Sequence, residues 1–202
     1  MKKILWFLLI ILILFVGLVY LSVSGNDKLI GTAKISNVDD LDNFNFREHD
    51  SILVAASTLY TGNFLKETMQ GSNYRRAWST AVTVPVVFLD TLKGGMKIIK
   101  EGGGSQTHSL RLQSANGTLY SLRSINKDPE SHVPEVAKTL GLENIIIDGI
   151  SAQHPYAAVA AAALAEFAGV LHTNPKPVFV PKQDVLGDFN KDYGNLAVPA
   201  GI

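Results

Sequence analysis

The first pattern in the chain is an uninterrupted apolar run near its N-terminal end. Eighteen residues without a charge, ILWFLLIILILFVGLVYL, run from Ile4 to Leu21 and follow two lysines. A helix of this length is ~27 Å long, which is close to the ~30 Å hydrocarbon thickness of a bilayer. It lacks the polar face that a helix at the surface of a folded core usually has. We therefore expect residues 1–22 to be a membrane anchor or signal segment that contacts the membrane through residues 4–21.

Two interpretations of this segment stay open. A signal peptide would be cleaved before Gly25, because Ser22 and Ser24 are small residues of the kind that precede a cleavage site. The apolar run is longer than the ~7–15 residues of a signal h-region, which favours an uncleaved, single-pass anchor. Lysines before the run favour a cytoplasmic N-terminus, so the following chain is expected on the extracytoplasmic side.

The chain that follows alternates between polar segments and short apolar ones. Residues 23–50 are polar and acidic around one strand candidate, LIGTAKI, and we interpret them as a tether. Residues 51–202 are expected to form a single domain. In its first part, SILVAASTLY is apolar but of ambiguous type, FLKETM predicts a helix, and YRRAW predicts a loop after it. The valine-rich VTVPVVFL predicts a strand, in which Pro85 indicates an edge or a bulge.

The clearest alternation of apolar and polar positions lies in the hairpin core, residues 96–127. The runs MKIIKE, SLRLQS and TLYSLRSI predict three consecutive strands. Asn116-Gly117 between the last two predicts a two-residue type I′ turn, which needs positive φ at both positions. The three strands are therefore expected to form an antiparallel meander.

Helices are expected after this meander. Pro134 suits the first turn of a helix over EVAKTLG, and ENIIIDGI continues the apolar pattern. Residues 154–169 predict a helix most clearly, with Pro155 near its start, alanines inside and Gly169 at its end. PVFV then predicts a buried strand ahead of a polar tail. The expected fold class is α+β, with a meander sheet packed on one side by helices.

Composition narrows the range of functions. The chain has 18 basic and 18 acidic residues and shows neither a basic surplus nor a clustered basic face, so nucleic acid is not expected as a partner. It has no cysteine, which excludes disulfides, thiolate metal sites and cysteine nucleophiles. The five histidines are scattered, and Asp188, Asn190 and Asp192 lack the glycine and glutamate that complete a calcium loop. We expect no metal site.

The most suggestive chemistry lies in EGGGSQTHSLRL. Consecutive glycines let backbone amides approach a phosphate, but they also form plain turns, and both interpretations stay open. The run is neither a P-loop nor a dinucleotide fingerprint, because no Gly-Lys-Ser/Thr follows and the glycines lead into a strand. Protein kinases use glycines between two strands over the nucleotide, and YSLR places Arg123 where a kinase has its lysine. Arginine keeps the charge of that lysine and changes its geometry.

A complete kinase is excluded by the rest of the chain. No HRD-x-x-x-x-N or DFG sequence follows PVFV, so the base and the metal-holding carboxylates of phosphoryl transfer are missing. Glu135 and Glu143 are both candidates for the glutamate that would orient Arg123, and the sequence does not rank them. We therefore expect a chain that is not an enzyme by itself.

Several stretches together resemble a group of bacterial envelope proteins of uncharacterised activity. They are SNYRRAWSTAVTVPV, GGGSQTHSLRL, YSLRSINKDP and ISAQHPYAAVAAAALAEFAGVLHTNPKPVFVPKQDVLGDF, from about Tyr74 to Asn195, with His154 to Val180 the most specific block. In related chains the segment lies beside a metallophosphoesterase region or an outer-membrane β-barrel assembly region. The resemblance implies a kinase N-lobe-like fold and a periplasmic location. Related chains continue past the GDF-x-x-x-x-GN region, so this chain is expected to be truncated relative to them.

The resemblance also implies which residues to test as a nucleotide-binding site. They are Gly102, Gly103, Gly104, Gln106, Thr107, Arg123 and Lys127. The expected function is a membrane-anchored extracytoplasmic binding or scaffolding module of the bacterial envelope, non-catalytic by itself, with an envelope protein as partner and no cofactor. The alternative is the nucleotide-binding half of an atypical kinase-like phosphotransferase that lacks its catalytic lobe, with ATP and magnesium as ligands.

Overall fold

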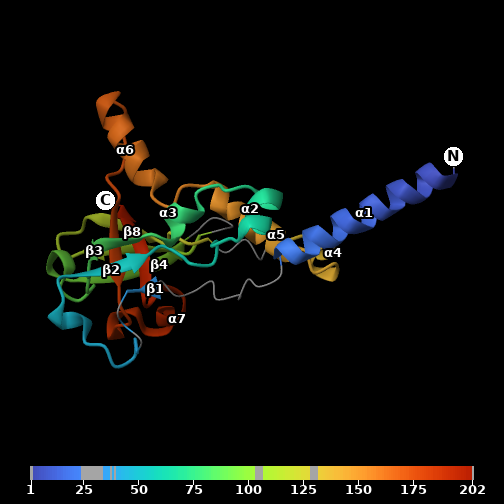
Figure 1. The fold of residues 1–202 in the computed structure, drawn as a ribbon. Helices are drawn as coiled ribbons and strands as arrows, with labels where there is room; N and C mark the ends of the chain where they lie inside the picture. The colour runs from blue at the N-terminus through green and yellow to red at the C-terminus, as the bar shows by residue number, and fades with distance from the viewer. Residues whose placement is uncertain are drawn as a thin grey trace.

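The computed structural model describes residues 2–23, 34–36, 38, 40–102, 107–127 and 132–201. These residues form an N-terminal apolar helix and an α+β domain with antiparallel sheets. The expected α+β class is therefore confirmed, and the kinase N-lobe-like form of it stays a prediction. Figure 1 shows the helix, α1 (Lys2–Val23), extending away from the domain. Its side chains are almost all exposed, and by length and composition it is able to cross a membrane.

The first sheet has three antiparallel strands in the order β1-β2-β3. They are β1 (Lys34–Ile35), β2 (Ser51–Ala55) and β3 (Ala81–Pro85). The apolar run of ambiguous type therefore begins with a strand. Two helices, α2 (Phe64–Gln70) and α3 (Arg75–Ser79), connect β2 to β3. α2 confirms the helix predicted from FLKETM.

The prediction of a loop over YRRAW was wrong, because most of that segment forms α3. Five residues are too few to show a helical period, so the sequence carried little signal. Trp78 is only 1% exposed, and its indole nitrogen donates to the carbonyl of Gln153 at 2.8 Å. Burial of this aromatic side chain stabilises the short helix where local propensity does not.

The second sheet has five strands in the order β4-β5-β6-β8-β7, each antiparallel to its neighbours. The strands are β4 (Met96–Gly102), β5 (Ser109–Ser114), β6 (Leu119–Arg123), β7 (Lys176–Val180) and β8 (Leu196–Gly201). The first three confirm the predicted meander, and β7 confirms the strand predicted from PVFV. A parallel bridge between Val86 and Phe179 joins this sheet to the end of β3.

The turn between β5 and β6 differs from the predicted type I′ turn. Gly117 has φ of 87°, but Asn116 is not among the described residues with positive φ. The amide of Gly117 donates to the carbonyl of Ser114 at 2.9 Å, and the amide of Ser114 donates to the carbonyl of Thr118 at 3.0 Å. This is a three-residue loop in which glycine alone occupies the left-handed position.

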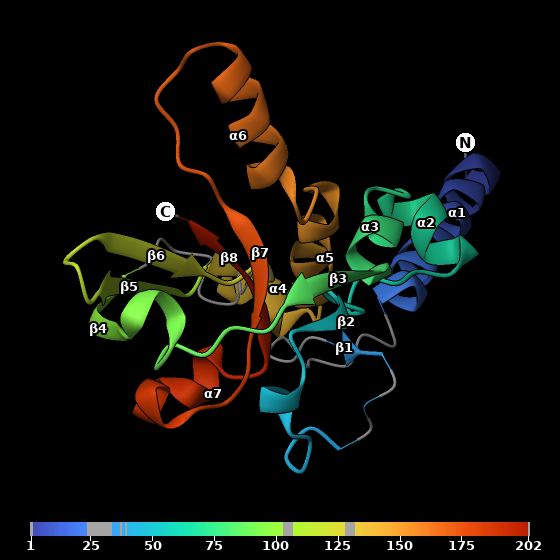
Figure 2. The same cartoon turned by 90° about the vertical axis from the view of Figure 1, so that its left-hand side faces the viewer.

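In the part of the chain that the structure describes, three α-helices lie between β6 and β7. They are α4 (Glu135–Thr139), α5 (Glu143–Asp148) and α6 (Ala157–Phe167). Gly169, with φ of 65°, follows α6 as expected for a helix end. The expectation that helices pack closely on the sheet was wrong for α6, of which only Ala162 is buried. Figure 2 shows α6 projecting from the sheets. Its alanine side chains offer little apolar area to bury against them.

The tail also contains regular structure that its polar composition did not reveal. A 3₁₀ segment over Asp184–Phe189 leads into α7 (Asn190–Tyr193), and β8 follows. Within the tail, Leu186 and Tyr193 are buried side chains that hold it against the second sheet.

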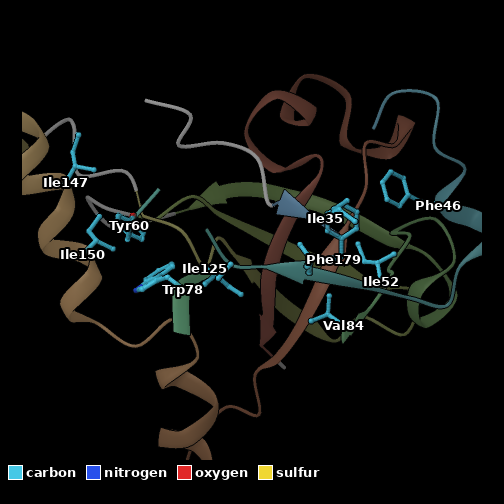
Figure 3. Close-up of a cluster of buried hydrophobic side chains, with 12 residues drawn as sticks. Ile35, Phe46, Ile52, Tyr60, Trp78, Val84, Ile125, Ile147, Ile150 and Phe179 are labelled. Atoms are coloured by element: carbon cyan, nitrogen blue, oxygen red, sulfur yellow. The ribbon is translucent and has the colours of Figure 1, made fainter. Parts of the chain in front are cut away.

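Two hydrophobic cores occupy opposite faces of β7. Phe179 points into the core between the first sheet and the helices, whereas Val178 and Val180 belong to the core of the second sheet. Figure 3 shows the first core, in which Trp78 and Tyr60 lie edge to face. Two shorter elements also contribute to this core, because Ile35 of β1 and Phe46 are each 6% exposed. The folded domain therefore begins within residues 23–50, which were interpreted as a tether.

Candidate functional site

One face of the β4–β5–β6 meander carries most of the polar residues of the three strands. Because side chains of directly paired residues lie on the same face of a sheet, the strand register defines which residues share it. A bulge between Ile98 and Lys100 keeps both lysines of β4 on this face. The paired rows are Lys97–Gln113–Leu119, Lys100–Arg111–Ser121 and Gly102–Ser109–Arg123.

This surface, which we call the basic face, carries four cations. Lys97, Lys100, Arg111 and Arg123 are all exposed, and none forms an ion pair or side-chain hydrogen bond with a residue in the described ranges. Lys100 and Arg111 are directly opposite each other, which is an unfavourable pairing of like charges. The rows contain no acidic residue. The sequence-based expectation of no basic cluster was therefore wrong, because the cluster forms only when three strands align.

The single carboxylate of β4 lies on the opposite face of the meander. Glu101 pairs with Leu110, and its carboxylate accepts a hydrogen bond from the hydroxyl of Tyr193 at 3.3 Å. Burial raises the pKa of Tyr193, and the nearby charge of Glu101 raises it further. The acidic group is thus held by the tail and does not neutralise the basic face.

A groove of about 520 Å³ runs between the end of β6 and α6. Volumes of this order accommodate small ligands. Its helix side consists of alanines spaced on one face of α6, and its strand side carries Ser121 and Arg123. The lining residues are Ser121, Arg123, Ala158, Ala161, Ala162, Ala165, His172, Thr173 and Pro175. Arg123 therefore belongs both to the basic face and to the wall of the groove.

The structure brings together part of the residue set predicted from the sequence. Gly102 and Arg123 occupy the same row of the basic face, with Ser109 between them. Thr107 lies two residues before β5 and is half-buried. Lys127 lies apart from this row, because its ammonium group donates to the side-chain oxygen of Gln153.

Gly103, Gly104 and Gln106 lie outside the described residues, so the glycine run itself is not placed. The backbone at Gly102 is placed, and a side chain there would meet Arg111 and Ser109 at 3.9 Å, an ordinary contact distance. No steric requirement for glycine therefore exists at the first position of the run. Both interpretations of the glycine run, as a phosphate-binding loop and as a plain turn, therefore stay open.

The arrangement suits the binding of anions. Exposed arginine and lysine side chains donate to phosphate or carboxylate oxygens, and Ser121 adds a neutral hydroxyl. Within the described part of the chain, no group of three or more histidines, aspartates or glutamates is placed to hold a metal ion. The face itself presents no carboxylate or histidine able to act as a general base, and His172 lies across the groove.

Sequence reasoning missed a second group of charges, which is buried. Arg75 makes a bidentate pair with Asp148, with nitrogen–oxygen distances of 2.7 and 2.6 Å. The ammonium group of Lys66 lies 2.9 Å from the same carboxylate. All three side chains are at most 5% exposed, so this cluster is closed to ligands and joins α2, α3 and α5. No motif spacing links residues 66, 75 and 148, and only the fold brings them together.

The comparisons with known proteins return no relative. No protein-family model, curated protein or solved structure matches the chain. The candidate site therefore rests on the geometry and charge of the residues described above.

Proposed function

We propose that this chain is a membrane-anchored extracytoplasmic binding module of the bacterial envelope, non-catalytic by itself. In this proposal α1 spans the membrane with its N-terminus in the cytoplasm, and the domain lies in the periplasm. The basic face binds a ligand that carries several phosphate or carboxylate groups, as part of an envelope partner molecule.

The observation that carries the proposal is the set of four unpaired cations on one sheet face. Bringing Lys97, Lys100, Arg111 and Arg123 together costs electrostatic energy that no described residue offsets. An external polyanion would offset it, and several charge-assisted hydrogen bonds would form at once. The chain as a whole has no net charge, so this face is a local feature and not a consequence of composition.

The membrane anchor has separate support. The last turn of α1 packs against α2, where the side-chain amide of Gln70 donates to the hydroxyl of Ser22 at 2.9 Å. Ser22 is only 3% exposed as a result. Ser22 was a candidate small residue of a signal cleavage site, and in the folded chain it forms a contact with the domain that an uncleaved anchor would retain.

The nucleotide-binding half of a kinase-like phosphotransferase is the second candidate. It is favoured by the shared row of Gly102 and Arg123, since a glycine loop and a cation facing one ligand is the arrangement that kinases use for ATP. The order of a three-stranded meander, helices and two further strands also agrees with the suggested resemblance to a kinase N-lobe. Phosphoryl transfer would still need a base and metal-holding carboxylates from another chain.

Two titrations of the full chain in an uncharged detergent separate these candidates. Tripolyphosphate is expected to bind and raise the melting temperature, and Arg123→Gln is expected to weaken binding by about tenfold, which corresponds to roughly 1.4 kcal/mol. Arg76→Gln is the matched control, because Arg76 is an exposed arginine on α3 with no ion pair to a described residue. Absence of binding, or an equal loss in both variants, would contradict the proposal.

ATP with magnesium provides the second titrant. If the basic face recognises only the negative charges of the phosphate groups, ATP binds no more tightly than tripolyphosphate. If ATP binds at least tenfold more tightly, the adenosine part is recognised as well and the second candidate is the better description. The comparison uses the same protein, detergent and salt concentration, because exposed charges are sensitive to ionic strength.

A further inference from the structure

The C-terminal end of α1 is held against the domain on two sides. On one side, Ser22 accepts a hydrogen bond from Gln70 of α2. On the other side, the hydroxyl of Tyr20 donates to the carbonyl of Leu140, at the end of α4, over 2.8 Å. The domain is therefore attached to α1 through side-chain contacts as well as through the chain that follows it.

The contact at Tyr20 places the end of α4 beside the apolar run of α1. Side chains on a helix lean toward its N-terminus, so the Tyr20 hydroxyl lies nearer the middle of α1 than the backbone of Tyr20 does. The carbonyl of Leu140 consequently lies beside the apolar run and not beyond its end. Carbonyl groups at the end of a helix have no partner within it, and this hydrogen bond supplies one.

Two apolar residues, one within α4 and one directly after it, are uncovered near this contact. Val136 is 69% exposed and Leu140 is 50% exposed. They are four positions apart, so they share one face of the helical turn. Half-buried leucine and isoleucine side chains of the following segment, at positions 142, 145 and 146, extend the apolar character toward the domain.

We propose that this face of α4 lies in the interfacial region of the bilayer leaflet from which α1 emerges. The inference rests on the proposed function, because it requires that α1 spans the membrane. The occupant of the face is lipid, since the face is continuous with the membrane-spanning helix through the Tyr20–Leu140 contact. Tyrosine at position 20 also suits the interface, where its ring is apolar and its hydroxyl finds a polar partner.

Single-cysteine labelling tests this proposal, because the chain has no cysteine of its own. Val136→Cys and Leu140→Cys are labelled with an environment-sensitive fluorophore in the full chain, reconstituted into phosphatidylcholine vesicles, which have no net charge and so do not attract the basic face. Leu119→Cys is the matched control, because Leu119 is 61% exposed on β6, and Figure 2 shows β6 on the far side of the domain from α1. Phe15→Cys, within α1, reports whether the helix itself is inserted.

The expected result is quenching of the labels at 136 and 140 by nitroxide-bearing lipids, and little quenching by aqueous iodide. The label at 119 shows the reverse. If labels at 136 and 140 are as open to iodide as the label at 119 while the label at 15 is quenched by lipid, the anchor stands and the interfacial position of α4 is overturned. If the label at 15 is not quenched by lipid, both the anchor and this inference are overturned.

Discussion

Asp148 and its two cations are enclosed, whereas the four cations of the basic face lie open on a sheet. In the buried cluster, one carboxylate receives Arg75 and Lys66 at distances of 2.9 Å or less, and little solvent reaches any of the three groups. On the basic face, no described residue supplies a counter-charge. Removing one partner from the enclosed cluster would leave an uncompensated buried charge, whereas the charges of the open face remain accessible to an external anion.

The largest effect is expected from removing the buried carboxylate. Asp148→Ala leaves Arg75 and Lys66 buried without this partner, and breaking such a pair typically costs about 3–5 kcal/mol. Urea denaturation of the full chain measures this loss. Asp42→Ala is the control, because Asp42 pairs with Lys182 at the exposed surface and its removal is expected to cost at most about 1 kcal/mol. Equal losses in the two variants would remove the distinction between enclosed and open charges.

On the basic face, removing charges should weaken ligand binding and leave the stability of the fold almost unchanged. Arg111→Gln with Arg123→Gln should reduce the affinity for tripolyphosphate by about a hundredfold, at roughly 1.4 kcal/mol for each position. The free energy of unfolding should stay within about 0.5 kcal/mol of its original value or rise slightly, since two mutually repelling charges are removed. A loss of stability similar to that of Asp148→Ala would mean that these arginines hold the fold together.

Ionic strength should affect the basic face more than the buried Asp148 cluster, although less than the substitutions do. Raising the ionic strength from about 0.05 M to about 0.5 M shortens the screening length severalfold, which weakens exposed charge interactions more than buried ones. Tripolyphosphate binding should therefore fall several-fold over this range. The stability difference between the original chain and Asp148→Ala should change little. An affinity that is independent of salt would argue against binding at the basic face.

The smallest expected effect concerns Tyr193, on the opposite face of the same meander. Its pKa is raised by burial and by Glu101, so the folded state favours the neutral phenol. The resulting stability is present below the unfolded pKa of about 10 and is lost as pH rises above that value. Tyr193→Phe should lose less stability between pH of about 9 and about 11 than the original chain does. Melting temperatures across this range measure the difference, and parallel curves would contradict the assignment.

The sequence predicted the parts of the fold that depend on local pattern. The meander over residues 96–127 and the helix near Ala160 followed from alternation and alanine content, because both signals lie within a few neighbouring residues. The short helix at Trp78 and the strand at Leu196 did not follow from such patterns. Their stability comes from burial against segments far away in the chain, which a local pattern cannot report.

The candidate site also combines residues that a local sequence pattern indicates with residues that only the fold brings together. Arg123 was selected from a motif and does lie on the basic face, yet the three other cations were not selected. Lys100 carried no distinguishing signal, because a bulge decides which face it joins. The Asp148 cluster was equally hidden, since its members are far apart in the sequence. Residues whose role depends on strand register or on distant packing become visible only in the folded chain.

The position of β8 also has a consequence for how the protein is made. Residues 196–201 leave the ribosome after β4, β5, β6 and β7, yet their strand lies between β6 and β7. Until they emerge, each of these two strands keeps a row of unpaired backbone groups on the side that β8 later occupies. The five-stranded sheet therefore cannot close during synthesis of its other parts. Closure of the sheet therefore waits for these six residues, and until they arrive β6 and β7 present open edges of the kind that other chains can pair with.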